Sequence, residues 1–355
     1  MNVTIRGIIG TGQIARVVAA LAVGGAAGCA TASGNSTAIR TEAETSAYPW
    51  PLKPFDRPHP IRAVLGDPRT TFLHPLRGDV LAGSGLFSFH DGVDIDAPNG
   101  TRVYPVTSGT VRFVDEESVV VQASDGRKFT YMHIVPAAHV GQGVTAQTTV
   151  LGRVNNWALE LHFSEVSASG RHANPLMPGH LAPYRDTTKP VVTALLLRSH
   201  GTDTTVRPFA VRGRVDVIAD AYDLPEPRTK EGFATTHFAG DRFGVAPAAL
   251  RWSLSTLDGR TVVAVGTAVD FRSGFPTGSL WSVYARGTYQ NRAPIVPRYH
   301  KKLPGRYLFE LTHLLDTRRV RDGVYVVMVT AVDAAGNVGS LRTRIEIRNH
   351  DALVR

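Results

Sequence analysis

Short apolar runs separated by turn residues recur along most of this chain, and they restrict its possible folds more than any other feature. Between Ile61 and about Asp186 the runs include TRVYPV, GTVRFV, SVVVQA and KFTYMHI, separated by glycine, asparagine or aspartate. Runs rich in β-branched and aromatic residues, with turn signals close together, are typical of antiparallel strands. The sequence therefore predicts an antiparallel β domain over residues 61–188.

A second β region follows over residues 189–350. Its runs include VRGRVDVIADAYD, AALRWSLSTLDG and TVVAVGTAVDF, and it closes with GVYVVMVTAVDAAGNVGSLRTRIEI. In the closing run the stretch Asp333–Asn337 supplies the turn chemistry of a hairpin. This run resembles the last hairpin of bacterial immunoglobulin-like domains, and the resemblance implies an immunoglobulin-like β-sandwich. The region is long for one sandwich, so we expect loop insertions at 222–245 and 284–306.

The length and charge of the chain set outer limits. A chain of 355 residues exceeds the usual size of a single hydrophobic core, which agrees with two β domains and accessory segments. The formal net charge of +9 could favour acidic partners such as nucleic acid or an anionic cell envelope. No dense run of lysine and arginine with interleaved aromatic residues occurs, so the sequence argues against nucleic-acid binding.

Residues 1–28 have the composition of an export signal. Arg6 and Arg16 come first, an apolar core follows over Val17–Gly28, and small residues come next. The apolar part is too short to span a bilayer. The stretch Gly10–Ala15 mimics part of a dinucleotide-binding fingerprint, but such a motif needs an acidic residue about twenty positions later. The first acidic residue of the chain is Glu42, and we reject a nucleotide site.

Cys29 is the only cysteine of the chain, and the small residues Ala26-Ala27-Gly28 precede it directly. This arrangement resembles a bacterial lipobox, although alanine replaces the usual leucine three residues before the cysteine. The resemblance implies a lipid anchor at Cys29, and hence a membrane-anchored lipoprotein in the periplasm or at the cell surface. Cleavage after Ala30-Thr31-Ala32 would instead give a secreted protein. Residues 29–60 are polar and then rich in proline, which predicts a stiff, extended tether.

Residues 158–166 read ALELHFSEV, a short strand that contains Glu160 and His162. Alternate side chains of a strand share a face, so these two side chains point the same way. They cost desolvation free energy unless a partner lies opposite them. Upstream, His90 and Asp94 are four residues apart, and Gly92 between them permits a close backbone approach.

A further histidine, His133, follows Tyr131-Met at the end of a predicted strand. Two histidines and one aspartate around a cation leave a coordination position open for water, which is the arrangement of a catalytic zinc site. A carboxylate ligand argues against an electron-transfer copper centre, and two imidazoles argue against calcium. The residue types therefore indicate zinc.

The order of these motifs resembles that of the lysostaphin and LytM-type peptidoglycan endopeptidases. It runs H-x-G-x-D, then G-T-x-V-Y-x-V-x-x-G-x-V, then Y-x-H, then x-L-H-F, with a closing N-P-L, and covers about residues 66–186. The resemblance implies that His90, Asp94 and His162 bind zinc and that His133 is a catalytic histidine outside the ligand shell. It also implies a LytM-type peptidase β domain, with peptidoglycan peptides as the substrate.

This chain departs from the family at Glu160, where the family carries the first histidine of His-x-His. Glu160 could act as a general base toward water, as glutamate does in other zinc peptidases. It could instead ligate the metal and close the site, or the domain could have lost hydrolysis. An ionised Glu160 beside zinc and Asp94 would give a neutral site, which acidifies water less.

Two functions therefore stay open. The first is a zinc metalloendopeptidase that hydrolyses peptide bonds of peptidoglycan cross-links in the bacterial cell envelope. The alternative is a catalytically impaired LytM-type module that binds peptidoglycan or regulates another cell-wall hydrolase. The intact ligand set favours the enzyme, and Glu160 favours the alternative.

Other polar residues have ordinary interpretations beside functional ones. Asp96 could support the metal site, but a turn-capping role fits it better. Arg69 could face a substrate carboxylate, although a plain turn is the simpler interpretation. We expect three further histidines to lie at the surface: His139, His172 and His180. Nothing in the C-terminal region indicates catalysis, so we expect it to be a spacer or a contact for an envelope protein.

Overall fold

The computed structural model describes residues 47–71, 86–155, 159–228, 244–276, 280–288 and 307–350. Within these ranges the regular structure is almost entirely antiparallel β-sheet, which confirms the predicted all-β class. The helices found there are two short 3-10 turns, η1 (Leu280–Ser282) and η2 (Thr317–Arg319). No helix in the described part is long and apolar enough to cross a membrane. The predicted export signal and Cys29 lie outside the described residues.

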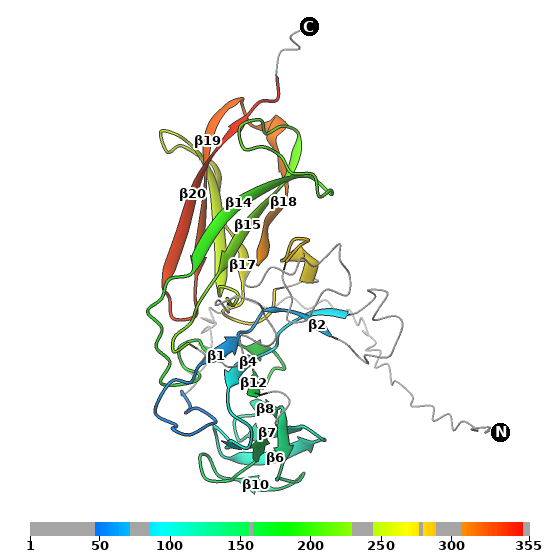
Figure 1. Ribbon diagram of the computed structural model, residues 1–355, viewed down its shortest axis with the longest axis vertical. Coiled ribbons are helices and arrows are strands. Elements are labelled where there is room, and N and C mark those ends of the chain that lie inside the picture. Colours follow the sequence, from blue (N-terminus) through cyan, green and yellow to red (C-terminus); the bar gives the residue numbers. More distant parts are fainter. Residues whose placement is uncertain are drawn as a thin grey trace, which may run out of the picture. The chain divides into compact units, whose positions relative to one another are not determined.

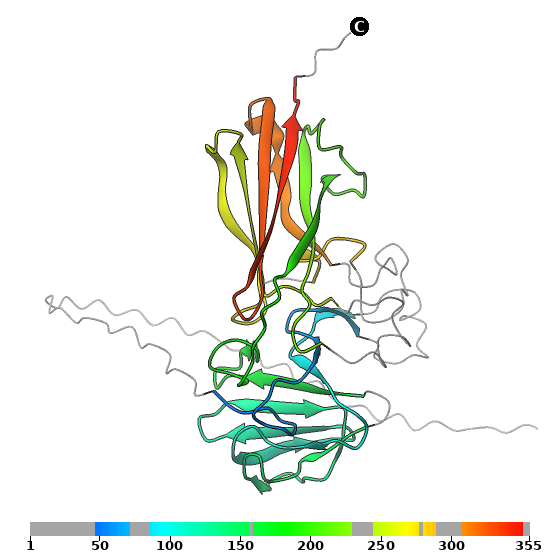
Figure 2. The same cartoon turned by 60° about the vertical axis from the view of Figure 1, so that its left-hand side comes forward.

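One large antiparallel sheet organises the first β region. Its strand order is β1-β4-β12-β8-β7-β6-β10, and β13 pairs with β12. Its strands are β1 (Ile61–Ala63), β4 (Val93–Asp96), β6 (Gly109–Val114), β7 (Ser118–Ala123), β8 (Lys128–Met132), β10 (Gly143–Val144), β12 (Glu160–Val166) and β13 (His172–Ala173). Figure 2 shows most of these strands, cyan to green, side by side.

Two smaller sheets belong to the same region. The first contains β5 (Arg102–Val103), β9 (Ile134–Pro136) and β11 (Gly152–Val154), and the second contains β2 (Pro68–Thr71) and β3 (Leu86–Phe89). The core of the large sheet includes the fully buried Phe129, Tyr131 and Phe163. The Tyr131 hydroxyl accepts a hydrogen bond from the backbone N–H of Val106 at 2.9 Å. Tyr131 is therefore a packed aromatic with a satisfied polar end.

The proline-rich segment differs from an extended tether at its C-terminal end. Trp50 is completely buried, and Tyr48 and Leu52 are almost completely buried. The indole N–H of Trp50 donates to the carbonyl of Pro183 at 2.7 Å, and the Tyr48 hydroxyl donates to Glu165. Proline spacing alone predicts a stiff solvated chain. Burial of the apolar side chains between the prolines, however, stabilises the packed arrangement. The described end of this segment is part of the domain core.

Two antiparallel sheets build the C-terminal region. One contains β14 (Val191–Ser199), β15 (Arg214–Tyr222) and β18 (Leu308–Asp316), and the other contains β16 (Ala249–Thr256), β17 (Thr261–Asp270), β19 (Gly323–Val332) and β20 (Val338–Ile347). Both sheets contribute to one apolar core, which includes Val217 of β15 and Val329 of β19. The long strands of both sheets are visible in Figure 1. This two-sheet arrangement is compatible with the immunoglobulin-like sandwich that the sequence resembles.

The predicted closing hairpin is present as β19 and β20, paired from Gly323↔Ile347 to Val332↔Val338. In its turn, Asn337 N–H donates to Asp333 Oδ1 at 2.8 Å, and Gly336 has φ +91°. Only glycine adopts such a backbone conformation without steric cost. Most of the two predicted loop insertions, residues 229–243 and 289–306, lies outside the described residues.

Candidate metal centre

Strands β4 and β12 are antiparallel neighbours, and their register sets the candidate site. His162 lies directly opposite Asp94, and Glu160 lies directly opposite Asp96. Residues opposite each other in such a pair project from the same face of the sheet. His90 directly follows β3 and lies three residues before β4. Gly92, between His90 and β4, is tightly confined, since a Cβ there would lie 2.2 Å from the carbonyl oxygen of Phe163. Glycine therefore allows the histidine to approach the strand pair.

Three potential ligand atoms meet at one point. His90 Nε2, Asp94 Oδ1 and His162 Nδ1 lie 2.9 Å from one another in all three pairings. All three side chains are buried. Ligands in a tetrahedral zinc site, each about 2.0–2.1 Å from the metal, are roughly 3.3 Å apart. The observed triangle needs only a small expansion to match this spacing.

The outer nitrogen of His90 has a hydrogen-bond acceptor, and that of His162 has a carboxylate close by. His90 Nδ1 lies 2.9 Å from the carbonyl oxygen of Val64, which accepts a hydrogen bond from Nδ1–H. His162 Nε2 lies 3.2 Å from a carboxylate oxygen of Asp91. With a proton on each outer nitrogen, His90 Nε2 and His162 Nδ1 both present lone pairs to the centre. Two neutral imidazoles and one carboxylate fit zinc with an open coordination position.

Arg69 lies against the opposite side of the Asp94 carboxylate. Its Nη2 atom is 2.7 Å from Asp94 Oδ2, so it orients the carboxylate with Oδ1 toward the histidines. Burial alone would raise the pKa of Asp94, but His90, His162 and Arg69 together hold it well below its usual range. The simpler interpretation of Arg69 as part of a plain turn was therefore wrong. Nothing local in the sequence shows that β2 brings Arg69 to this carboxylate.

Glu160 lies in the same cluster and is held by Arg62 of β1. Its Oε2 atom is 2.8 Å from Arg62 Nη1, and its Oε1 atom is 3.8 Å from His133 Nε2. The His133 and His162 rings are 6.2 Å apart between centroids. Burial and then the Asp94 charge raise the pKa of Glu160 to about 8, against the opposing effect of Arg62. Burial lowers the pKa of His133 to about 4.

Backbone strain coincides with this cluster. His133 has φ +65° and Leu159, directly before Glu160, has φ +54°. Residues other than glycine rarely adopt this left-handed conformation, and such residues cluster at functional sites. The contacts above bring together the five residues that the sequence predicts for the site: His90, Asp94, His133, Glu160 and His162.

Asp91 is a polar residue of this site that the sequence analysis overlooked. With His90 and His162 it forms a group whose potential ligand atoms all lie within 4.8 Å of one another. We assign the central carboxylate to Asp94 because its Oδ1 is closer to both histidines, and Asp91 then serves the outer nitrogen of His162. The sequence does contain a signal for this role of Asp91, because the residue directly follows the predicted ligand His90.

The three histidines predicted to lie at the surface differ in their exposure. His139 is exposed, and His172 is half-buried, with its ring 4.9 Å from the Phe275 ring between centroids. His180 is not a free surface residue, because its Nδ1 atom lies 2.6 Å from Glu165 Oε2. Glu165 is itself only 1% exposed, so His180 and its neighbours compensate a buried charge in the core face of β12.

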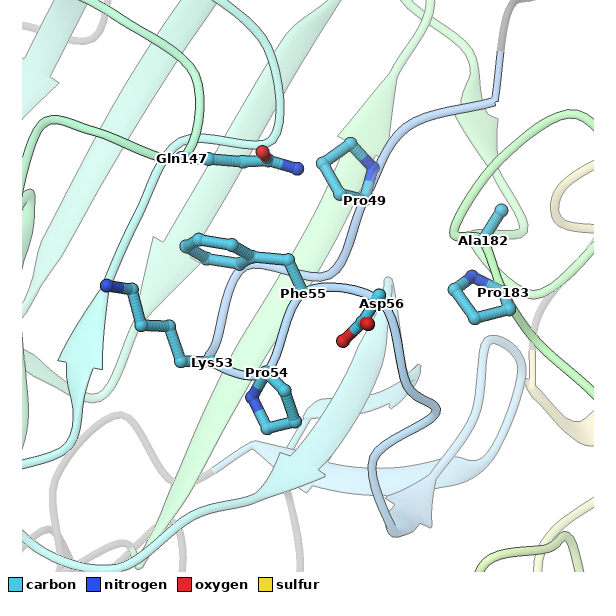
Figure 3. A pocket seen from close by; sticks show the side chains of 8 residues that line it. All are labelled: Pro49, Lys53, Pro54, Phe55, Asp56, Gln147, Ala182 and Pro183. Carbon is cyan, nitrogen blue, oxygen red and sulfur yellow. The ribbon is translucent and has the colours of Figure 1, made fainter.

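A large open pocket in the described part of the chain lies away from these residues. It has a volume of about 770 Å³ and is lined by Lys53, Phe55, Asp56, Gln147 and three prolines among others. Figure 3 shows Phe55 and Lys53 beside Gln147 at this pocket. None of the residues of the candidate metal centre lines it. Its size alone does not connect it with the chemistry of that centre.

Comparison with known proteins identifies residues 88–175 as a Peptidase family M23 domain. This segment contains all five residues predicted for the site: His90, Asp94, His133, Glu160 and His162. No curated protein matches the chain.

Three solved structures are among those similar to part of the chain. The SpoIIQ–SpoIIIAH pore-forming complex has 18% identity, with 37% of this chain and 90% of that chain covered, at a TM-score of 0.28. A mutant catalytic domain of the prophage-encoded M23 protein EnpA from Enterococcus faecalis has 23% identity, with 35% and 95% covered, at 0.25. The catalytic domain of lysostaphin from Staphylococcus simulans has 21% identity, with 31% and 86% covered, at 0.24.

Proposed function

We propose that the M23 peptidase domain of this chain is a zinc metalloendopeptidase that hydrolyses peptide bonds of peptidoglycan cross-links. The observation that carries the proposal is the convergence of His90 Nε2, Asp94 Oδ1 and His162 Nδ1, each 2.9 Å from the other two. The family match over residues 88–175 supports the reaction class. The substrate class rests on the resemblance of the motif order to lysostaphin and LytM-type enzymes.

The three ligand residues, Glu160 and Arg62 have definite parts in this proposal. His90, Asp94 and His162 would hold zinc, which supplies Lewis-acid activation of water and of the peptide carbonyl. Glu160 lies on the same strand face as His162, and its ionised form, which Arg62 and the zinc charge would favour, accepts the proton of the attacking water. Arg62, 2.8 Å from Glu160, fixes the direction of that carboxylate.

A second candidate function is a non-catalytic module that binds peptidoglycan or regulates another cell-wall hydrolase. The ion pair between Glu160 and Arg62 favours it, because one carboxylate oxygen is already occupied. Glutamate also lacks the donor that an imidazole offers to a developing oxyanion when the glutamate is ionised.

One experiment separates the two functions. The purified full-length protein is incubated with peptidoglycan in the presence of zinc, and released peptides are identified by mass spectrometry. Sedimentation with insoluble peptidoglycan measures binding in the same samples. The peptidase releases new peptide termini that His90→Ala does not release. Binding without any release by the wild type would reject the enzyme and support the binding module.

We also propose that the chain is exported and anchored through a lipid at Cys29, in the periplasm or at the cell surface. The small residues before this single cysteine support the anchor. Secretion after cleavage near Ala30-Thr31-Ala32 is the alternative. The two C-terminal sheets would then form an immunoglobulin-like sandwich that acts as a spacer or contacts an envelope protein.

A further inference from the structure

Three buried aspartates from separate segments meet outside the candidate metal centre. Asp186 lies in the segment before β14, Asp223 follows β15, and Asp333 begins the turn between β19 and β20. They are 6%, 4% and 2% exposed respectively. Each offers a carboxylate oxygen, and these three oxygens lie within 4.8 Å of one another.

Hydrogen bonds satisfy only part of this cluster. Thr188 donates its backbone N–H and its hydroxyl to Asp186 Oδ1, and Asn337 donates to both oxygens of Asp333. Asp186 Oδ2 and Asp223 Oδ1 are buried and lack a hydrogen-bond partner in good geometry, and the Tyr184 hydroxyl lies near Asp186, so that burial and the charge of Asp186 raise the pKa of Tyr184. Among the described residues, no Lys, Arg or His forms an ion pair with any of the three. Buried carboxylate oxygens without a partner carry a large desolvation cost.

Mutual repulsion adds to that cost. Burial and then the charges of Asp333 and Asp186 raise the pKa of Asp223 to about 8. Either a proton or a cation must offset the negative charge of this cluster near neutral pH. The two carboxylate oxygens without hydrogen-bond partners are the positions where a cation would restore the missing interactions.

We propose that Asp186, Asp223 and Asp333 form a calcium site. All the side-chain donors are carboxylate oxygens, which hard cations prefer, and no nitrogen or sulfur ligand is present to favour zinc. Calcium binds oxygens at about 2.4 Å, so two of its ligands can be up to about 4.8 Å apart, whereas magnesium limits this separation to about 4.1 Å. The three oxygens lie within 4.8 Å of one another, a spacing that calcium can bridge.

The surroundings have room for a further ligand of the cation. A small cavity of about 10 Å³ lies beside Asp223, and Tyr184, Pro225 and Ala334 are among its lining residues. This volume corresponds to about one water molecule, and calcium completes its six to eight ligands with water.

Calcium at this site would connect three parts of the chain. Asp223 continues from β15 of the three-stranded sheet, and Asp333 belongs to the hairpin of the four-stranded sheet. Asp186 lies in the segment that leads from the M23 domain into β14, and its backbone carbonyl accepts a hydrogen bond from Asn337 Nδ2 at 3.0 Å. The cation would stabilise the entry of the chain into the C-terminal sheets.

Calcium binding and thermal unfolding of the chelator-treated full-length protein test the proposal. Terbium binding is followed by its luminescence, sensitised by nearby aromatic side chains such as Tyr184, and calcium should displace the terbium. Calcium at about 100 times its dissociation constant should raise the unfolding midpoint by roughly 5 °C or more. The same measurements on His90→Ala exclude a contribution from the M23 site, because the calcium effect should persist there.

Substitutions within the cluster give the sharpest outcome. Asp223→Asn removes one carboxylate ligand of the cation, so it should abolish the gain in the unfolding midpoint that calcium gives the wild type. Asp186→Asn should reduce terbium affinity at least tenfold. This variant replaces Asp223→Asn as the test of the site if Asp223→Asn fails to fold. Asp216→Asn, a buried aspartate elsewhere in β15, should keep the full calcium gain. Absence of calcium-displaceable terbium in the wild type, or an unchanged calcium gain in Asp223→Asn, would overturn the proposal.

Discussion

The guanidinium of Arg62 in β1 lies 2.8 Å from the carboxylate of Glu160 in β12, and the two form an ion pair. A second guanidinium, that of Arg69, lies 2.7 Å from Asp94. The sequence alone indicates that Asp94 and Glu160 would neutralise a zinc ion. The two arginines offset the two carboxylates, so the positive charge of a bound zinc ion would remain. Glu160 is therefore compatible with the electrostatics of a hydrolytic site.

We expect one zinc ion per chain in the purified full-length protein. His90→Ala removes one corner of the ligand triangle, so this variant should lose most of the zinc. His139→Ala is the matched control, because His139 is exposed and contributes to no part of the site. Elemental analysis of the three proteins after removal of free metal checks the assignment. Equal zinc in the wild type and His90→Ala would contradict it.

Asp91→Asn should weaken zinc binding by a factor on the order of 10 to 100. Asparagine removes the carboxylate charge that lies 3.2 Å from His162 Nε2, so the ring loses part of its orientation and basicity. Zinc affinity is measured by titration against a competing chelator, which is independent of any peptidase activity. Asp56→Asn is an exposed control that should bind zinc like the wild type. Wild-type affinity in Asp91→Asn would remove Asp91 from the site.

Local sequence patterns identify the centre of the site but not its periphery. The spacing of His90 and Asp94 and the alternation in β12 depend on residues close in sequence, and the structure brings them together. Arg62 and Arg69 reach the centre from β1 and β2, whose positions depend on tertiary pairing that no local pattern reveals. The aspartates around Asp223 likewise come from three distant segments.

The buried part of the proline-rich segment was overlooked for a different reason. Its prolines dominate the composition, while Tyr48 and Trp50 supply the apolar surface that buries it. A polar network also accompanies this packing, because Tyr48, Arg127 and His180 all contact Glu165. These partners are distant in sequence, and Glu165 alone in an apolar strand gave no indication of them.

Cys29 should carry the lipid in the exported protein. Several acyl chains hold a protein stably at a membrane, whereas a single chain gives only marginal binding. A clickable fatty acid supplied to producing cells should label the wild type and leave Cys29→Ala unlabelled. Label on both proteins would place the modification elsewhere, and label on neither would favour secretion after Ala30-Thr31-Ala32.

Glu165→Gln should destabilise the protein most at neutral pH and least in acid. Burial alone would raise the pKa of Glu165, but hydrogen bonds from His180 and Tyr48, with the charge of Arg127, lower it overall. A pKa lower in the folded than in the unfolded state contributes stability above the unfolded value of about 4.3. That contribution disappears as pH falls through the folded pKa.

The measurement is the free energy of unfolding of wild type and Glu165→Gln between neutral pH and about pH 3. The difference should be about 1–3 kcal/mol at neutral pH, because the partly buried His180 and Arg127 lose a charged acceptor, although Arg127 keeps Asp125. Glu116→Gln, an exposed control, should change stability by less than about 0.5 kcal/mol at any pH. A difference for Glu165→Gln that stays constant across this range would contradict the assigned direction of the shift.

The last prediction concerns the role of Glu160 itself. Glu160→Gln preserves size but removes the proton acceptor, so turnover of peptidoglycan should fall by a factor on the order of 10² or more while zinc content is kept. Glu160→His restores an acceptor and should retain substantial activity. Arg62→Met is the complementary variant, because it frees Glu160 from its ion pair without removing the carboxylate.

The alternatives for Glu160 give different results in the same assays. If Glu160 ligates the metal, Glu160→Gln loosens zinc, since a neutral amide is the poorer ligand. If the domain only binds peptidoglycan, the wild type releases no peptides, and Glu160→Gln changes nothing. Peptide release by mass spectrometry and zinc affinity by chelator competition, measured on all four proteins, therefore distinguish the three roles. Full zinc content together with undiminished cleavage in Glu160→Gln would exclude Glu160 as the base, because the glutamine in that variant cannot accept the proton of the attacking water.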